Sequence, residues 1–178
     1  MIQYSRKCSK GIWEKGCDLT ASTSKKVVVR RFDREPMAGF VNPRTYQLAD
    51  GIELLTQAGT VQVLPYEEVK AVCFVRDFEA APSEPGQRVF LSRPKTDGLW
   101  VRMKFRDGEI MDGLLPNDLL RTERAGFTVV PPNPSSNNQR IFVPRSALVE
   151  SQVLGVVGSP LKPRKAKPVS KTQMEMFE

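Results

Sequence analysis

Hydrophobic and polar positions alternate over short stretches of this chain, and the stretches end at glycine, proline or aspartate. Short alternating runs rich in valine, isoleucine and aromatic residues are typical of half-buried β-strands. We therefore predict ten strands, which fall into two groups of five. The predicted strands cover residues 27–32, 37–42, 51–56, 60–64, 69–75, 99–105, 109–115, 126–130, 140–143 and 148–154.

The two groups repeat the same landmarks in the same order, and repetition of this kind predicts two copies of one structural unit. The prolines of both copies preset φ for a single helical turn before the last strand, and the glycines are expected at bends or turns. The offset between partners grows along the chain, so the insertions fall in loops. The matching pairs are Phe32 and Phe105, Gly39 and Gly113, Gly51 and Gly126, and Pro65 and Pro144.

Five short strands with one helical turn before the last strand resemble the SH3-like small barrels. Residues 140–145, followed by Leu148, resemble the second half of the Sm-like variety. The resemblance covers residues 27–78 and 99–154, and it implies an all-β fold of two tandem five-stranded SH3/Sm-like barrels. The Arg-Gly signature and the Asp/Asn pair with which Sm proteins grip RNA do not occur here, so uridine-tract binding is not implied.

The composition completes the domain plan. We predict a flexible basic N-terminal segment at 1–26, the first barrel at 27–78, a linker at 79–98, the second barrel at 99–154, and a flexible basic tail at 155–178. A unit of about 50 residues buries too little surface to be robust alone. The two barrels are therefore expected to pack together or to associate with copies in a homo-oligomer.

The net charge of +7 lies in the terminal segments, which carry +4 (residues 1–26) and +3 (residues 155–178). The two repeats carry −1 and +1, which weighs against a dedicated cationic nucleic-acid surface on the folded body. Weak, non-specific nucleic-acid contact is expected from basic residues of the tail. These residues are Lys162, Arg164, Lys165 and Lys167. Binding of RNA or a nucleotide by the barrels remains the alternative function.

The sequence contains no histidine, which removes the usual general base and the commonest metal ligand. Cys8 and Cys17 lack the two-residue spacing of zinc knuckles and thiol redox pairs, so neither a metal nor a cofactor is expected. Cys73 lies in an apolar stretch and is expected to be a small buried hydrophobe. No apolar run approaches the ~20 residues that span a bilayer, so we expect a soluble cytoplasmic protein.

Carboxylate, lysine and tyrosine side chains remain as candidates for catalysis, and the named candidates are carboxylates. Asp107, Glu109 and Asp112 cluster near one predicted hairpin, where turns favour acidic residues in any case. The enzyme interpretation is therefore the weakest, and the sequence favours a non-enzymatic binding or adaptor protein. The alternating charges at 102, 104 and 106 are interpreted as the solvent face of a strand, and residues 88–91 as an added edge strand.

The end of the tail carries the most specific functional signal. An apolar cluster at the tip of a polar, Pro/Lys/Arg-rich segment is typical of a linear docking peptide. Gln173, Met174, Met176 and Phe177 resemble the bacterial sliding-clamp-binding peptide, with methionine in place of leucine at two positions. The resemblance implies a protein partner, with the clamp as first candidate. Two alternatives remain: the tip folds back onto a barrel, or the tail is inert.

Overall fold

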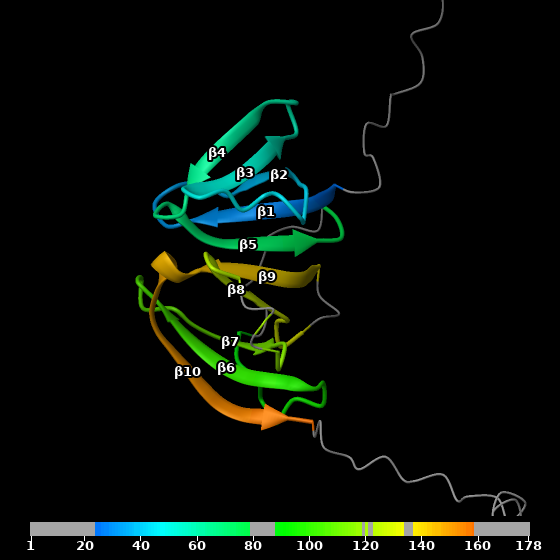
Figure 1. Ribbon diagram of the computed structural model, residues 1–178, viewed down its shortest axis with the longest axis vertical. Coiled ribbons are helices and arrows are strands. Elements are labelled where there is room, and N and C mark those ends of the chain that lie inside the picture. The colour runs from blue at the N-terminus through cyan, green and yellow to red at the C-terminus, as the bar shows by residue number, and fades with distance from the viewer. Residues whose placement is uncertain (1–23, 79–87, 119, 121–122, 134–136, 159–178) are drawn as a thin grey trace, which may run out of the picture.

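The computed structural model describes residues 24–78, 88–118, 120, 123–133 and 137–158, and these residues form an all-β fold (Figure 1). A 3-10 turn, η2 (Arg145–Ala147), precedes the last strand. Within the described residues, no helix has the length and apolar character needed to cross a membrane. The strands are β1 (Lys25–Arg31), β2 (Met37–Val41), β3 (Gly51–Thr56), β4 (Val61–Pro65), β5 (Val69–Val75), β6 (Gly98–Phe105), β7 (Ile110–Leu115), β8 (Gly126–Val129), β9 (Asn138–Pro144) and β10 (Leu148–Val157).

The strands form where hydrophobic and polar residues alternate along the sequence. All ten predicted strands are present, and their ends differ from the predicted ends by three residues at most. In β1 the side chains of Val27 and Val29 are fully buried in one core, and Val28 packs against a second core on the other face of the sheet. This arrangement follows from the two-residue period of a strand. Hydrophobic residues on both faces therefore mark a strand buried between two layers.

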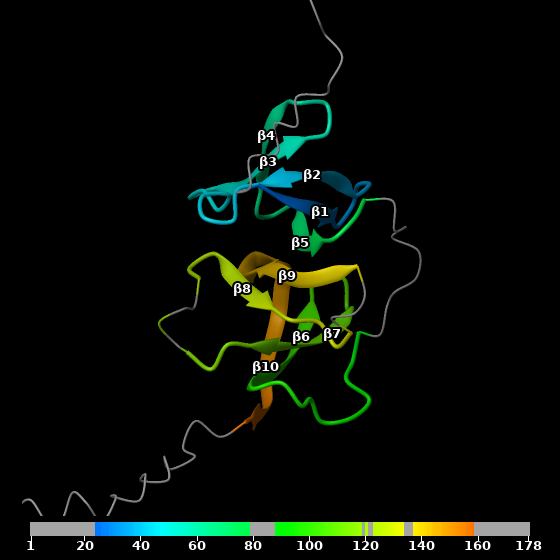
Figure 2. The same cartoon turned by 90° about the vertical axis from the view of Figure 1, so that its right-hand side faces the viewer.

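The ten strands form two antiparallel sheets. The larger sheet has the order β4-β3-β2-β1-β5-β9-β8, and the smaller has the order β10-β6-β7. Both repeats place their fifth strand beside their first: β5 pairs with β1, and β10 pairs with β6. The larger sheet crosses from one repeat to the other because β5 also pairs with β9. In two orthogonal views, β5 and β9 run side by side between the two halves of the molecule (Figures 1 and 2).

The two repeats contribute side chains to each other's core. Phe142 of β9 is fully buried in the core formed mainly by β1–β5. In return, Ala71, Cys73 and Val75 of β5 pack with Val101 and the rest of the core formed mainly by β6–β10. The structure therefore confirms the all-β class but does not confirm two closed tandem barrels, because the sheets remain open and the fifth strand of one repeat pairs with the fourth strand of the other.

The turns before the fifth strands follow the prolines, as predicted. The amide of Glu68 donates to the carbonyl of Pro65 at 3.0 Å in the first repeat, and η2 follows Pro144 in the second. The paired glycines, however, lie in strands and not in bends. A Cβ at Gly51 would collide with the carbonyl of Leu64, and a Cβ at Gly126 would collide with that of Val143. At Gly51 and Gly126 a glycine is required because a neighbouring backbone comes too close for a side chain.

An ion-pair cluster also links the repeats. The ammonium group of Lys70 on β5 contacts the carboxylates of Asp107 and Glu109 in the β6–β7 hairpin, the latter at 2.7 Å. The guanidinium of Arg106 stacks 4.3 Å from the ring centroid of Phe32 and donates to the carbonyl of Glu67 at 2.7 Å. Ion pairs and a cation–π contact thus join the β6–β7 hairpin of the second repeat to the first repeat.

Candidate binding site

The candidate site is a cavity where β7 and β8 separate. In the first repeat, the second and third strands pair over two registered positions, Gly39 with Thr56 and Phe40 with Leu55. In the second repeat, the equivalent strands meet through one isolated bridge between Leu114 and Val130. The amide of Leu114 donates to the carbonyl of Val130 at 3.0 Å, and the reverse bond is 2.9 Å. The opening beside this bridge is called the seam pocket.

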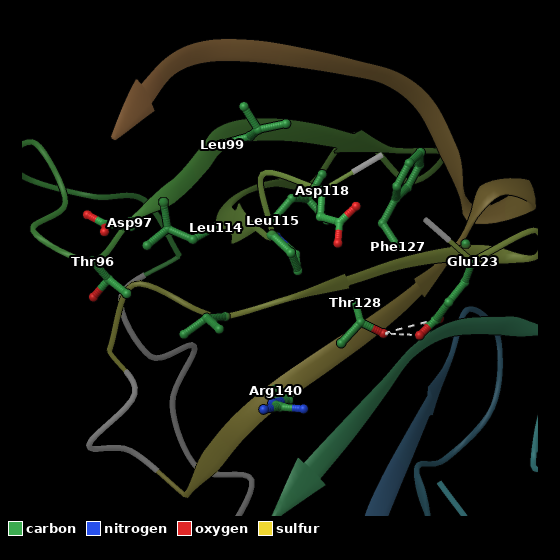
Figure 3. Close-up of a pocket in the computed structure, with 13 residues that line it drawn as sticks. Thr96, Asp97, Leu99, Leu114, Leu115, Asp118, Glu123, Phe127, Thr128 and Arg140 are labelled. Carbon is green, nitrogen blue, oxygen red and sulfur yellow. Dashed lines mark hydrogen bonds between the residues drawn. The ribbon is translucent and has the colours of Figure 1, made fainter. Parts of the chain in front are cut away.

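The seam pocket has a volume of about 650 Å³ (Figure 3). Its apolar lining includes Leu115 and Phe127, which are both half-buried and therefore able to lose further exposure to a ligand. A concave site with an apolar floor and a few polar groups is the usual form of a ligand-binding site. The lining residues are Thr96, Asp97, Leu99, Leu114, Leu115, Pro116, Asp118, Glu123, Gly126, Phe127, Thr128, Val130 and Arg140.

The polar groups of the seam pocket are mainly acidic. Asp97, Asp118 and Glu123 contribute carboxylates, and Arg140 contributes the one guanidinium among the lining residues. Figure 3 shows Asp97 at one end of the pocket and Glu123 at the other, with Leu115 between them. Opposite charges attract strongly next to an apolar wall, where little water screens them. The arrangement therefore suits a ligand with an apolar group and at least one positive charge.

Glu123 is held in place by hydrogen bonds from both repeats. The hydroxyl of Thr128 donates to its carboxylate oxygens at 3.1 and 3.2 Å, and the Gln47 amide donates at 2.6 Å. The same Gln47 amide also donates to the hydroxyl of Tyr46 at 2.8 Å. Burial raises the pKa of Tyr46 far above its ordinary value, so this hydroxyl is neutral. The position of Glu123 thus depends on the loop between β2 and β3.

The residues predicted for partner binding lie outside the described residues. This holds for Gln173, Met174, Met176 and Phe177, and equally for the basic residues Lys162, Arg164, Lys165 and Lys167. The clamp-binding and nucleic-acid hypotheses therefore remain predictions. The described residues begin at 24 and end at 158.

Two of the three candidate catalytic carboxylates lie at the predicted hairpin and form ion pairs. Glu109 also pairs with Arg88, at 2.8 Å between Oε1 and the guanidinium. Burial alone would raise the pKa of Asp107, but the hydrogen bonds from Lys70 and from the backbone outweigh it and leave that pKa below its ordinary value. The structure gives Asp107 and Glu109 a role in joining the two repeats.

Asp112 corrects the sequence prediction, because it lies in β7 and not in a hairpin turn, and it is completely buried. Arg102 donates to it twice, at 2.7 Å from Nε and 3.0 Å from Nη2. The Trp100 indole and the Phe90 amide each donate at 3.3 Å. Arg102 is therefore a partner of a buried carboxylate, and its hydrogen bonds with Asp112 raise its own pKa.

The segment expected to add an edge strand does not form one and is joined to β7 by a single backbone hydrogen bond. The Asp112 amide donates to the Arg88 carbonyl at 2.7 Å, but no strand forms over residues 88–91. The ring of Phe90 instead meets that of Trp100 edge to face, with the centroids 5.9 Å apart. Phe90 thus contacts Trp100 of β6 and donates to the Asp112 carboxylate of β7.

The buried thiol of Cys73 agrees with its predicted role as a small hydrophobe. It is 4% exposed, and burial raises its pKa to about 11. Because the thiolate is the reactive form, this thiol is protected in the folded protein. The described part of the chain also holds no group of three or more acidic, cysteine or histidine side chains placed to bind a metal ion.

Sequence reasoning missed the seam pocket because its carboxylates follow no motif. Asp97 precedes β6, whereas Asp118 and Glu123 both lie between β7 and β8, and each residue type is ordinary in a loop. The signal that could have found the pocket is a mismatch between the repeats. Tyr46 occupies the loop between the second and third strands of the first repeat, and the corresponding loop of the second repeat contains no aromatic residue.

Comparison with protein families gives a match over most of the chain. Residues 23–155 match a family described as "Family of unknown function (DUF6982)". The chain belongs to this family. The DUF6982 match spans both repeats and every residue that lines the seam pocket. No curated protein and no solved structure matches the chain significantly.

Proposed function

We propose that the protein is a non-enzymatic adaptor built from two SH3-like small barrels that are open at their edges. The support for the barrel assignment is the strand order. Each repeat places its fifth strand beside its first, its second strand on the other side of the first, and a single turn before the fifth. Small β-barrels commonly bind their ligands through loops and open strand edges.

The observation that carries the adaptor function is the seam pocket. It combines the half-buried side chains of Leu115 and Phe127 with the carboxylates of Asp97, Asp118 and Glu123. A peptide with an aliphatic side chain next to a lysine or arginine matches both features. Catalysis has less support, because Asp107, Glu109 and Asp112 are each engaged by a basic side chain. The negative lining also opposes phosphate, which disfavours the RNA- or nucleotide-binding alternative at this site.

A peptide-display selection tests this function directly. The purified full chain should enrich peptides that contain an aliphatic residue beside a basic residue. Leu115→Lys places a charge on the apolar floor and should abolish their binding. Leu91→Lys is the matched control, because Leu91 is 88% exposed and lies outside the lining. Equal binding to both variants would show that the pocket is not the binding site, and an absence of enriched peptides would argue against the function.

The second binding element of the proposed adaptor is the C-terminal peptide at residues 173–178, with the bacterial sliding clamp as its first candidate partner in the cytoplasm. A short flexible peptide should bind with micromolar affinity, about −8 kcal/mol, because ordering it offsets much of the contact energy. In calorimetry with the purified clamp, Phe177→Ala should weaken binding more than tenfold and leave the melting temperature unchanged. A lower melting temperature would instead assign the tail to the fold.

A further inference from the structure

The C-terminal tail leaves the folded body at the edge of the seam pocket. Val157, the last residue of β10, pairs with Gly98, and the next residue, Gly158, lies directly against the side chain of Asp97. Gly158 has a φ of 83°, and a Cβ there would collide with the Asp97 carboxylate. Asp97 lines the pocket. The tail therefore begins next to one wall of the pocket.

The first part of the tail has the chemistry that the pocket suits. Leu161 is an aliphatic residue only three positions after Gly158, and it is followed directly by Lys162. Further positive charges follow at Arg164, Lys165 and Lys167. The lining of the pocket offers three carboxylates against one guanidinium. Charge and apolar character thus match between a segment of this chain and a site on the same chain.

The chain is also long enough for this contact. An extended chain advances about 3.3–3.6 Å per residue, so Leu161 reaches about 10 Å from Gly158 and Lys167 reaches about 30 Å. Because the tail begins at the pocket wall, its basic residues are held near the carboxylates at a millimolar effective concentration, a typical order of magnitude for a short linker. A contact with a dissociation constant well below millimolar is largely formed under that condition.

We propose that residues 160–167 occupy the seam pocket of their own chain, with Leu161 on the apolar floor and the basic side chains on the carboxylates. This inference rests on the proposed function, in which the pocket is a binding site. The pocket would then be filled at rest, and an outside peptide would have to displace the tail. A partner that draws the tail away would open the pocket, so the two binding elements of the adaptor would be coupled.

The test uses the full chain and one synthetic peptide that covers residues 159–171. In the tail variant, Lys162, Arg164, Lys165 and Lys167 are changed to glutamine. In the control variant, Arg6, Lys7, Lys10 and Lys15 are changed to glutamine, which removes the same charge at the other end. Binding is measured by NMR titration of the backbone amides of Leu115, Gly126 and Phe127 in each protein.

The peptide should bind the tail variant at least about tenfold more tightly than the wild type or the control, because the internal competitor is weakened. The spectrum of the tail variant without peptide should also differ from that of the wild type at these amides. Equal binding to all three proteins would overturn the inference but leave the pocket as a binding site. Binding to none of them would overturn it too, and the display selection would then decide whether the pocket binds other peptides.

A tail that reaches the pocket of a second copy would also overturn the proposal. In that case the spectral difference between wild type and tail variant would grow with protein concentration. Occupation within one chain predicts a difference that stays constant over a hundredfold dilution.

Discussion

The two repeats share a strand order but differ in how their loops meet their cores. In the first repeat, the loop between β2 and β3 buries Tyr46, which is 4% exposed and meets the rings of Phe74 and Phe142 edge to face. At the corresponding place in the second repeat, Leu120 is 97% exposed. The same topology therefore supports two outcomes: a loop that fills its core, and a loop that leaves a pocket beside it.

The fifth strands differ in the same way. Cys73 of β5 and Val153 of β10 lie opposite equivalent positions of the first strands, Val28 and Val101. Cys73 is 4% exposed because β5 lies between β1 and β9, whereas Val153 is 58% exposed on a strand that pairs with β6 alone among the described strands. The difference teaches that position in the sheet, and not position in the repeat, decides burial.

The largest expected difference in stability concerns the β2–β3 loop and the β7–β8 loop. Tyr46→Ala removes a buried aromatic side chain and should lower the free energy of unfolding by about 4 kcal/mol. Leu120→Ala removes an exposed side chain and should change it by less than about 0.5 kcal/mol. Urea unfolding of both variants provides the comparison. Similar losses would mean that Leu120 is buried in solution and that the loops do not differ.

The next largest loss of stability is expected from substitutions in the fifth strands, β5 and β10. Cys73→Gln places an amide in a core without a partner and should cost about 3 kcal/mol. Val153→Gln makes the same change on an exposed strand and should cost less than about 0.5 kcal/mol. Thermal unfolding measures both. A large loss for Val153→Gln would show that β10 is covered in solution, for example by a second copy of the chain.

The sequence predicts the local features of the fold, and it does not predict the contacts between the repeats. The strands were predictable because valine-rich alternation is local, and the turns after Pro65 and Pro144 follow from the fixed φ of proline. The pairing of β5 with β9 was not predictable, because it joins residues such as Cys73 and Ile141 that are far apart in the chain. The pocket was missed for the same reason: Asp97 and Glu123 line one cavity only after the strands are placed.

The buried carboxylate of the second repeat has no acidic counterpart in the first, where Ala38 holds the corresponding position of β2. Asp112→Ala should cost about 2 kcal/mol, because Arg102, Trp100 and the Phe90 amide all lose an acceptor. Ala38→Ser, which adds one hydroxyl at the corresponding position of β2, should cost less than half as much. Chemical unfolding distinguishes them. If the double variant Asp112→Ala/Arg102→Met is no more stable than the single variant, the unpaired arginine is not the cause of the loss.

The smallest expected effect concerns the ion pair that joins the repeats. Asp107 is 39% exposed in its ion pair with Lys70, so solvent screening limits its contribution to less than about 1 kcal/mol. Its pKa is lowered in the folded protein. A lowered pKa contributes stability above the unfolded-state value of about 3.9, and the contribution disappears as the pH falls through the lower folded-state value.

Asp107→Asn should therefore be slightly less stable than the wild type at pH 7, and the difference should shrink as the pH falls below the unfolded-state pKa of about 3.9 and through the lower folded-state pKa. Asp33→Asn is the matched control, because Asp33 lies in the exposed β1–β2 turn of the first repeat, whereas Lys70 pairs with Asp107 and Glu109. Denaturant unfolding between pH 2.5 and 7 measures both differences. A stability difference for Asp107→Asn that persists at low pH would assign the effect to lost packing. A difference for Asp33→Asn with the same pH dependence would show that the link between the repeats is not its source.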